Sequence, residues 1–127
     1  DIPDAHPNTA RIQLSDEAGQ SIEMQAASVG GGSIEVTELD GIRVGFSGEL
    51  DTIVVTHEDD VGVVAELTHI IAAHSLNLAS IRCSRTVRGR DAVTVMEVDG
   101  MVMQECMTEL EKIPQIHRCM LIHRLGE

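Results

Sequence analysis

Residues 52–74 read TIVVTHEDDVGVVAELTHIIAAH and contain three patterns in succession. The β-branched run Thr52–Thr56 predicts a short buried strand, and the polar residues His57–Asp60 predict a turn. Five apolar side chains and one histidine then recur at helical spacing, at Val63, Val64, Leu67, Ile70, Ile71 and His74. Asp59 or Asp60 is the expected cap of this helix, because a carboxylate can accept hydrogen bonds from its first amide groups.

Downstream of this stretch the chain again alternates between strand and helix patterns. Residues 77–87 and 92–98 are β-type runs. Helical spacing follows at Met103, Cys106, Met107, Leu110 and Ile113. Pro114 ends that helix, and residues 116–123 form the last predicted strand. The order βαββαβ predicts a ferredoxin-like sandwich for residues 51–127, with one core between two helices and a four-stranded sheet.

Residues 1–50 have a different character, because glycines and acidic turns separate short β-type runs. These runs cover residues 11–14, 21–29, 34–39 and 42–44. Asp40-Gly41 is a hairpin signal between the last two. This pattern predicts an antiparallel meander with no helix of its own, so we expect its sheet to pack against another domain or chain. The predicted fold class of the whole chain is α+β.

The charge balance excludes two classes of partner. The chain has 127 residues, with 9 basic and 21 acidic side chains and a formal net charge of −12. Nucleic acid and anionic membranes are therefore not expected as partners, since both bind basic surfaces. Phe46 is the only aromatic residue, which excludes recognition by aromatic stacking.

The cysteines do not form a recognisable metal motif. Cys83, Cys106 and Cys119 are the three cysteines, and no CxxC pair is present. An odd count at these spacings predicts reduced thiols in a cytoplasmic protein, with no disulfide framework and no metal site built from this chain.

The predicted turn His57–Gly62 is the first candidate site. The start of a helix offers backbone N–H groups and a partial positive charge, both of which suit a carboxylate. Gly62 permits close approach, and Asp59 or Asp60 can accept an ammonium group. These properties suit a small amino acid. The alternative is a capped helix with a solvated acidic turn.

Three other stretches carry polar or flexible groups. Ser28–Ser33 contains Gly30, Gly31 and Gly32, which form either a backbone anion nest or a bulged connection between strands. His6-Pro7-Asn8-Thr9 offers an acid or base beside two orienting groups, or else a surface turn. The third stretch is an arginine cluster, which either faces an acidic partner or forms a solvated hairpin. Its members are Arg82, Arg85, Arg88 and Arg90.

Read in order, these motifs resemble a known arrangement. His6–Ile12, then Ser28–Ile34, then a βαββαβ module is similar to the C-terminal part of the β subunit of iron–sulfur-dependent L-serine dehydratases. In this resemblance residues 1–50 are the end of an allosteric-substrate-binding-type domain, and residues 51–127 are an ACT domain. The chain begins at Asp1 without a methionine and lacks that family's Ser-Ser-Ser-His-Thr motif, so we expect it to be part of a longer subunit.

The resemblance implies an activity that this chain shares with a partner. The family converts L-serine to pyruvate and ammonia, using a 4Fe–4S cluster as Lewis acid on the substrate hydroxyl. The cluster cysteines belong to the α subunit, so this chain is expected to bind no cofactor and to be inactive alone. His6, Asn8 and Thr9 would face the α subunit near the serine site, with His6 orienting groups or handling a proton. Gly30–Gly32 would allow the backbone to approach the other domain or the substrate closely.

The resemblance also implies a regulatory ligand and a dimer. His57, Asp59, Asp60 and Gly62 occupy the ligand loop of ACT domains, and Asn77 matches a second ligand position. L-Serine or another small amino acid is the expected ligand, and a homodimer through the ACT domains is the expected assembly. Two alternatives stay open: the regulatory region of a D-3-phosphoglycerate dehydrogenase, and a free-standing binding or oligomerisation module.

Overall fold

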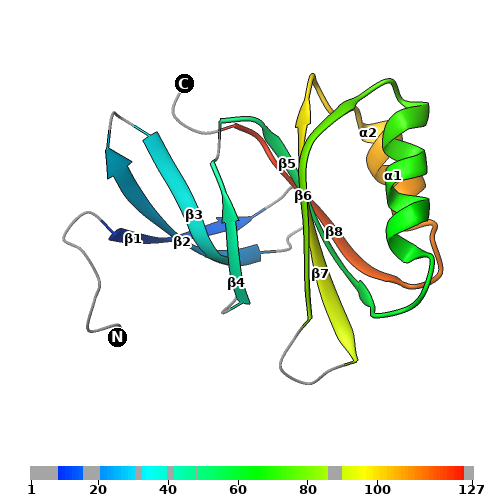
Figure 1. Ribbon diagram of the computed structural model, residues 1–127, viewed down its shortest axis with the longest axis horizontal. Coiled ribbons are helices and arrows are strands. Elements are labelled where there is room, and N and C mark those ends of the chain that lie inside the picture. The colour runs from blue at the N-terminus through cyan, green and yellow to red at the C-terminus, as the bar shows by residue number, and fades with distance from the viewer. Residues whose placement is uncertain are drawn as a thin grey trace. The chain divides into compact units, whose positions relative to one another are not determined.

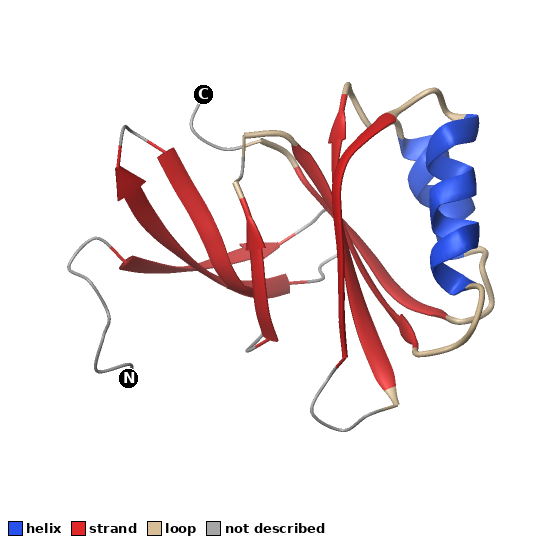
Figure 2. Cartoon of the chain, in the orientation of Figure 1, coloured by secondary structure: helices blue, strands red, loops and turns tan. Residues whose placement is uncertain are grey.

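A computed structural model describes residues 9–15, 21–30, 33–39, 42–47, 49–85 and 90–124 (Figures 1 and 2). The chain divides into two units, Asp1–Glu49 and Leu50–Glu127.

The first unit is the antiparallel meander that the glycine-separated runs predict. Its strands are β1 (Thr9–Ser15), β2 (Ser21–Gly30), β3 (Ser33–Leu39) and β4 (Ile42–Phe46). They form one sheet in the order β1-β2-β3-β4, with every neighbouring pair antiparallel. Among the side chains described in these strands, the buried ones are Met24, Ala26, Val36, Val44 and Phe46. The predicted turns at residues 16–19 and 40–41 lie outside the described residues.

The second unit has the predicted βαββαβ order. Its elements are β5 (Asp51–Glu58), α1 (Val63–Ala73), β6 (Asn77–Arg85), β7 (Asp91–Asp99), α2 (Gln104–Glu111) and β8 (Ile116–Ile122). The strand order is β6-β7-β5-β8, and each neighbouring pair is antiparallel. Figure 2 shows both helices covering the same face of this sheet. The ferredoxin-like α+β prediction is therefore confirmed.

The core of this unit lies between the helices and that sheet face. The helices bury Val63, Leu67, Ile71, Cys106, Met107 and Leu110. The strands contribute Ile53, Val55, Met96, Val98 and Cys119 to the same cluster. The helical spacing read from the sequence thus selects the buried faces, except at Met103, which precedes α2 and is 56% exposed. Burying one such aliphatic side chain contributes about 1.5–3 kcal/mol, so this cluster is the main source of the unit's stability.

Two local predictions about the strand-to-helix connection are wrong. The first strand continues through His57 and Glu58, which were expected in the turn, because the His57 side chain finds polar partners inside the unit. The helix begins after Gly62, which has a φ of 92° and provides no capping side chain. Neither Asp59 nor Asp60 caps it. Glycine tolerates this left-handed conformation, whereas a residue with a Cβ atom is strained there.

Candidate functional site

The connection between β5 and α1 is tied to two other strands through its backbone. The Glu58 N–H donates to the carbonyl of Gln115 at 3.0 Å, just before β8. The Asp59 N–H donates to the carbonyl of Arg90 at 3.0 Å, just before β7. These bonds hold the loop at the end of the sheet where β5 and β6 both terminate, since both strands run antiparallel to β7.

At Gly62, where the loop meets the start of α1, no described side chain covers the backbone. The space around Gly62 is empty, with no atom within 4 Å of the position a Cβ atom would take. No side chain caps α1, and its first internal hydrogen bond runs from the Glu66 N–H to the Gly62 carbonyl at 3.1 Å. The first-turn amides therefore face the loop without a capping side chain. This arrangement favours an anionic group such as a carboxylate.

The acidic residues of the loop differ in their surroundings. Asp59 is held by an ion pair in which its Oδ2 atom lies 2.7 Å from Nε of Arg85. The Asp59 side chain is 27% exposed and the Arg85 side chain 77% exposed. Asp60 is exposed. Asp59 is thus the more fixed of the two carboxylates, and it points toward the end of β6.

His57 lies beneath the loop and is buried, with 2% of its surface exposed. Its Nδ1 atom lies 2.7 Å from the Glu58 carbonyl, and its Nε2 atom lies 2.7 Å from the Thr94 hydroxyl. A carbonyl oxygen only accepts hydrogen bonds, so Nδ1 carries the hydrogen of the first contact, and Nε2 pairs with the Thr94 hydroxyl. Both ring nitrogens are used inside the unit, and His57 therefore shapes the loop from below.

Thr94 and Arg85 are the residues that the sequence reasoning missed. Thr94 is fully buried in the middle of β7, and a polar residue within the apolar run 92–98 was the available signal. Arg85 belongs to the arginine cluster, for which one interpretation was a solvated hairpin. Sequence spacing alone does not single it out from its three neighbours.

Asn77 lies at the opposite end of the sheet from this loop. It pairs with Asp99 on β7, whereas His57 pairs with Ala92 on the same strand. At about 3.3 Å per residue, those levels are roughly 20 Å apart. The Asn77 side chain donates to Oδ2 of Asp99 at 3.0 Å. One copy of the chain therefore does not bring Asn77 to the loop.

The remaining predicted site residues are barely described. His6, Asn8, Gly31 and Gly32 lie outside the described residues. Thr9 begins β1 and Gly30 ends β2, and only their backbone is placed.

Two of the three cysteine thiols are buried, which disfavours the thiolate form that binds metal. Cys83 is exposed on β6, whereas Cys106 and Cys119 are buried. Burial, together with the nearby Glu111 carboxylate, raises the pKa of Cys119 to about 12. Burial and Glu109 also raise the pKa of Cys106. Thiolates ligate iron, and burial shifts the Cys106 and Cys119 thiols toward the protonated form. Within the described ranges no three histidine, cysteine or acidic side chains are placed to hold a metal ion.

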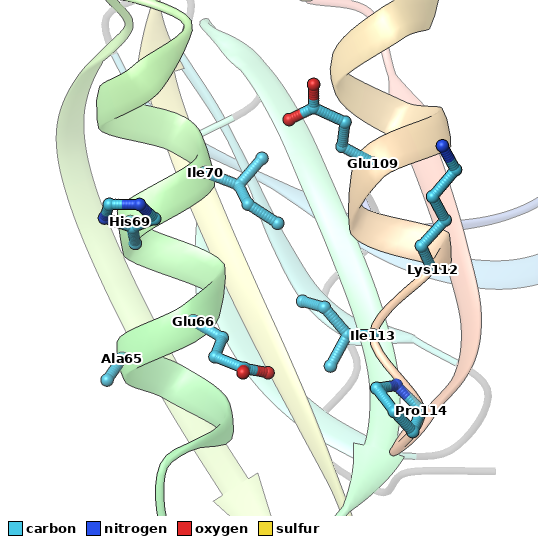
Figure 3. Close-up of a pocket in the computed structure, with 8 residues that line it drawn as sticks. All are labelled: Ala65, Glu66, His69, Ile70, Glu109, Lys112, Ile113 and Pro114. Carbon is cyan, nitrogen blue, oxygen red and sulfur yellow. The ribbon is translucent and has the colours of Figure 1, made fainter.

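A separate groove of about 410 Å³ runs between α1 and α2 (Figure 3). Ile70 and Ile113 contribute apolar surface to it. Its charged lining residues are Glu66, Glu109 and Lys112. Two carboxylates against one ammonium group make this groove a poorer place for an anion than the uncapped start of α1. Across the part of the chain that is described, no helix is both long and apolar enough to cross a membrane.

Comparison with known families decides the identity of the second unit. The family described as AHAS small subunit-like ACT domain matches residues 53–118. The chain belongs to the ACT domain family. The matched residues include the loop His57–Gly62 and Asn77.

Relatives of this ACT-containing chain include two serine dehydratase subunits. The probable L-serine dehydratase β chain of Bacillus subtilis is 38% identical over 116 residues, which are 91% of this chain and 52% of that protein. The L-serine dehydratase β chain of Peptoniphilus asaccharolyticus is 24% identical over 74% of this chain and 42% of that protein. The resemblance read from the motifs is confirmed, and the chain spans about half the length of these relatives.

A second group of relatives is more distant. The D-3-phosphoglycerate dehydrogenase of Bacillus subtilis is 23% identical over 87 residues, which are 68% of this chain and 17% of that protein.

Proposed function

We propose that this chain is the C-terminal part of an L-serine dehydratase β chain, in which residues 51–127 form a regulatory ACT module for a small zwitterionic amino acid. L-Serine is the first candidate ligand. The observation that carries the proposal is the extent of the similarity. The alignment with the Bacillus subtilis β chain spans 91% of this chain, so it includes the meander as well as the ACT domain.

The loop chemistry supports a zwitterionic ligand. The uncapped start of α1 suits a carboxylate, and Asp59 offers a negative group for an ammonium ion. No described side chain obstructs the start of the helix at Gly62, where a Cβ atom would meet no atom within 4 Å. His57 acts in this proposal by fixing the Glu58 carbonyl and hence the loop.

The position of Asn77 supports a site shared by two copies. Strand β6 is an edge of its sheet, most of its side chains are exposed, and Ile81 is 39% exposed. Such an edge is a template for pairing with another strand. Antiparallel pairing of two β6 strands centred on Ile81 aligns Asn77 of one copy with Arg85 of the other. Asn77 then lies at the end of the sheet that carries the second copy's ligand loop.

The deamination chemistry is assigned to a different chain. A 4Fe–4S cluster on the α subunit would polarise the serine hydroxyl. His6, Asn8 and Thr9 are proposed to face that subunit, with His6 as the orienting or proton-handling group. This chain alone is expected to release no pyruvate from L-serine.

One alternative has its own support. The similarity to D-3-phosphoglycerate dehydrogenases would fit a regulatory region of such an enzyme, but that alignment covers 68% of the chain at 23% identity. A nucleotide-binding domain encoded upstream in the same gene would favour it over the serine dehydratase assignment.

Calorimetric titration of the 127-residue chain tests the ligand proposal. L-Serine should bind, and Asp59→Ala or Asn77→Ala should weaken binding at least about tenfold, as expected when a hydrogen bond to a charged group is lost. Glu105→Ala and Gln104→Ala remove an exposed carboxylate and an exposed amide on α2 and should leave binding unchanged. A lack of binding by L-serine and by other small amino acids would leave only the free-standing module. Pyruvate released from L-serine by this chain alone would contradict the assigned division of chemistry.

A further inference from the structure

The carboxylate that is proposed to receive the ligand's ammonium group already has a cationic partner. Oδ2 of Asp59 lies 2.7 Å from Nε of Arg85, at the end of β6. The hydrogen bond from the Asp59 N–H to the Arg90 carbonyl keeps this carboxylate beside the start of β7. An ammonium ion that reaches Asp59 therefore meets a guanidinium group there.

The two members of this pair differ in freedom. The Arg85 side chain is 77% exposed, whereas the Asp59 side chain is 27% exposed. An exposed ion pair is weak, since its contribution corresponds to at most about a fivefold change in an equilibrium. Arg85 can swing aside at small cost while Asp59 stays in place.

The consequence depends on the charges that the ligand carries. A simple amine that displaces Arg85 leaves the guanidinium without its carboxylate. A zwitterion brings a replacement, because its carboxylate has two oxygens: one can lie at the start of α1, as in the proposed function, while the other pairs with the displaced guanidinium and the ammonium group pairs with Asp59. Both original charges then keep a partner of opposite sign.

We propose that Arg85 is a specificity-determining residue of the ACT site, which selects zwitterionic amino acids by exchanging its ion pair with Asp59 for one with the ligand's carboxylate. The inference rests on the proposed function, because it takes Asp59 as the ammonium acceptor. It adds a residue from the end of the edge strand to the loop site.

Arg82 provides a matched control for charge. It lies on the same strand and is exposed in a single copy. Because it neighbours Ile81, the centre of the proposed β6 pairing, the oligomeric state of both variants is compared with wild type first. Arg82 pairs with Val95 and Arg85 pairs with Ala92, so the two side chains leave opposite faces of the sheet. Arg82→Gln and Arg85→Gln change the net charge equally, and only the second removes the partner of Asp59.

The test compares L-serine with ethanolamine, which has the same ammonium and hydroxyl groups and no carboxylate. Dissociation constants for both are measured by NMR titration of the full chain, following the amide signals of the loop. Arg85→Gln should weaken L-serine binding about three- to tenfold and leave ethanolamine binding unchanged or strengthened up to about fivefold. The dissociation constant of Arg85→Lys for L-serine should lie between those of the wild type and Arg85→Gln.

Several results would overturn the inference. Equal effects of Arg82→Gln and Arg85→Gln would mean that net charge alone matters. Tighter L-serine binding in Arg85→Gln, or binding that appears only in that variant, would make Arg85 a block to the site while keeping Asp59 as the acceptor. If neither wild type nor Arg85→Gln binds L-serine, the proposed function fails together with the inference.

Discussion

Replacing Thr94 with valine removes the hydroxyl group that pairs with the His57 ring while keeping the branched shape of the side chain. The Thr94 Oγ1 atom lies 2.7 Å from Nε2 of His57, and both residues are buried. A buried ring nitrogen without a partner costs about 1–3 kcal/mol. Carbon contacts are longer than this hydrogen bond, at about 3.5–4.0 Å, so the new methyl group also pushes the ring. We therefore expect a loss of about 2–3 kcal/mol in the free energy of unfolding.

Thr94→Ser is the matched control, because it keeps the hydroxyl and removes a methyl group. Its expected cost is about 1 kcal/mol. Urea unfolding followed by circular dichroism measures both variants, and similar slopes would allow direct comparison. His57→Leu completes a double-mutant cycle with Thr94→Val, and a coupling energy of about 1–2 kcal/mol is expected because the double variant has no unsatisfied ring nitrogen.

The reasoning about this buried pair is refuted by either of two results. One is a Thr94→Val variant at least as stable as Thr94→Ser. The other is strict additivity of His57→Leu and Thr94→Val, since that would mean the two side chains do not interact.

Three further predictions concern backbone strain, core packing and thiol chemistry. Gly62→Ala should lower the free energy of unfolding by about 1–2 kcal/mol from strain alone, since its φ is 92° and its surroundings are open. Gly100→Ala should cost more, because a Cβ atom there would also lie 3.2 Å from a Leu76 methyl carbon; the opposite order in urea unfolding would contradict this account. Leu67→Ala should cost about 2–5 kcal/mol in the same assay, as Leu67 is completely buried, and a loss below about 1 kcal/mol would be inconsistent with that packing. The pKa of Cys119 is raised from 9.0 to about 12. The stability that the protonated thiol contributes is therefore present below pH 9 and is lost as the pH rises from 9 to about 12. Cys119→Ser should flatten this loss of stability, and unfolding curves at alkaline pH that show the same loss in the variant would contradict this assignment.

The sequence predicts the architecture of the second unit because its apolar residues have clear periods. Helical spacing from Val63 to Ile71 and from Cys106 to Leu110 marks the faces that pack on the sheet. These patterns depend on burial, which a single sequence records directly. The meander of the first unit is likewise marked by its β-type runs.

The details of the ligand loop were harder to predict because they depend on tertiary contacts. His57 and Glu58 look like turn residues, yet His57 is drawn into the strand by Thr94, which lies 37 positions away in the sequence. Asp59 looks like a helix cap, yet the helix begins only after Gly62 and the Asp59 carboxylate pairs with Arg85 instead. A polar side chain can pair with any of several groups, and the tertiary structure determines which of them lies within reach.

The separation of Asn77 from the loop could not be predicted from motif positions at all. Both belong to the ligand set that the resemblance implies, and only strand direction shows that they lie at opposite ends of one sheet. This separation is the reason for proposing that two copies complete each ligand site.

Subunit complementation tests that shared site most directly. Asp59→Ala and Asn77→Ala chains are each titrated with L-serine, then mixed one to one after reversible dissociation and titrated again. Each variant alone should bind serine at least about tenfold more weakly than the wild type, whereas a mixed dimer regains one intact site and the mixture should show about a quarter of the wild-type sites at wild-type affinity. If the mixture binds serine no better than either variant alone, the ligand site is not built from both copies.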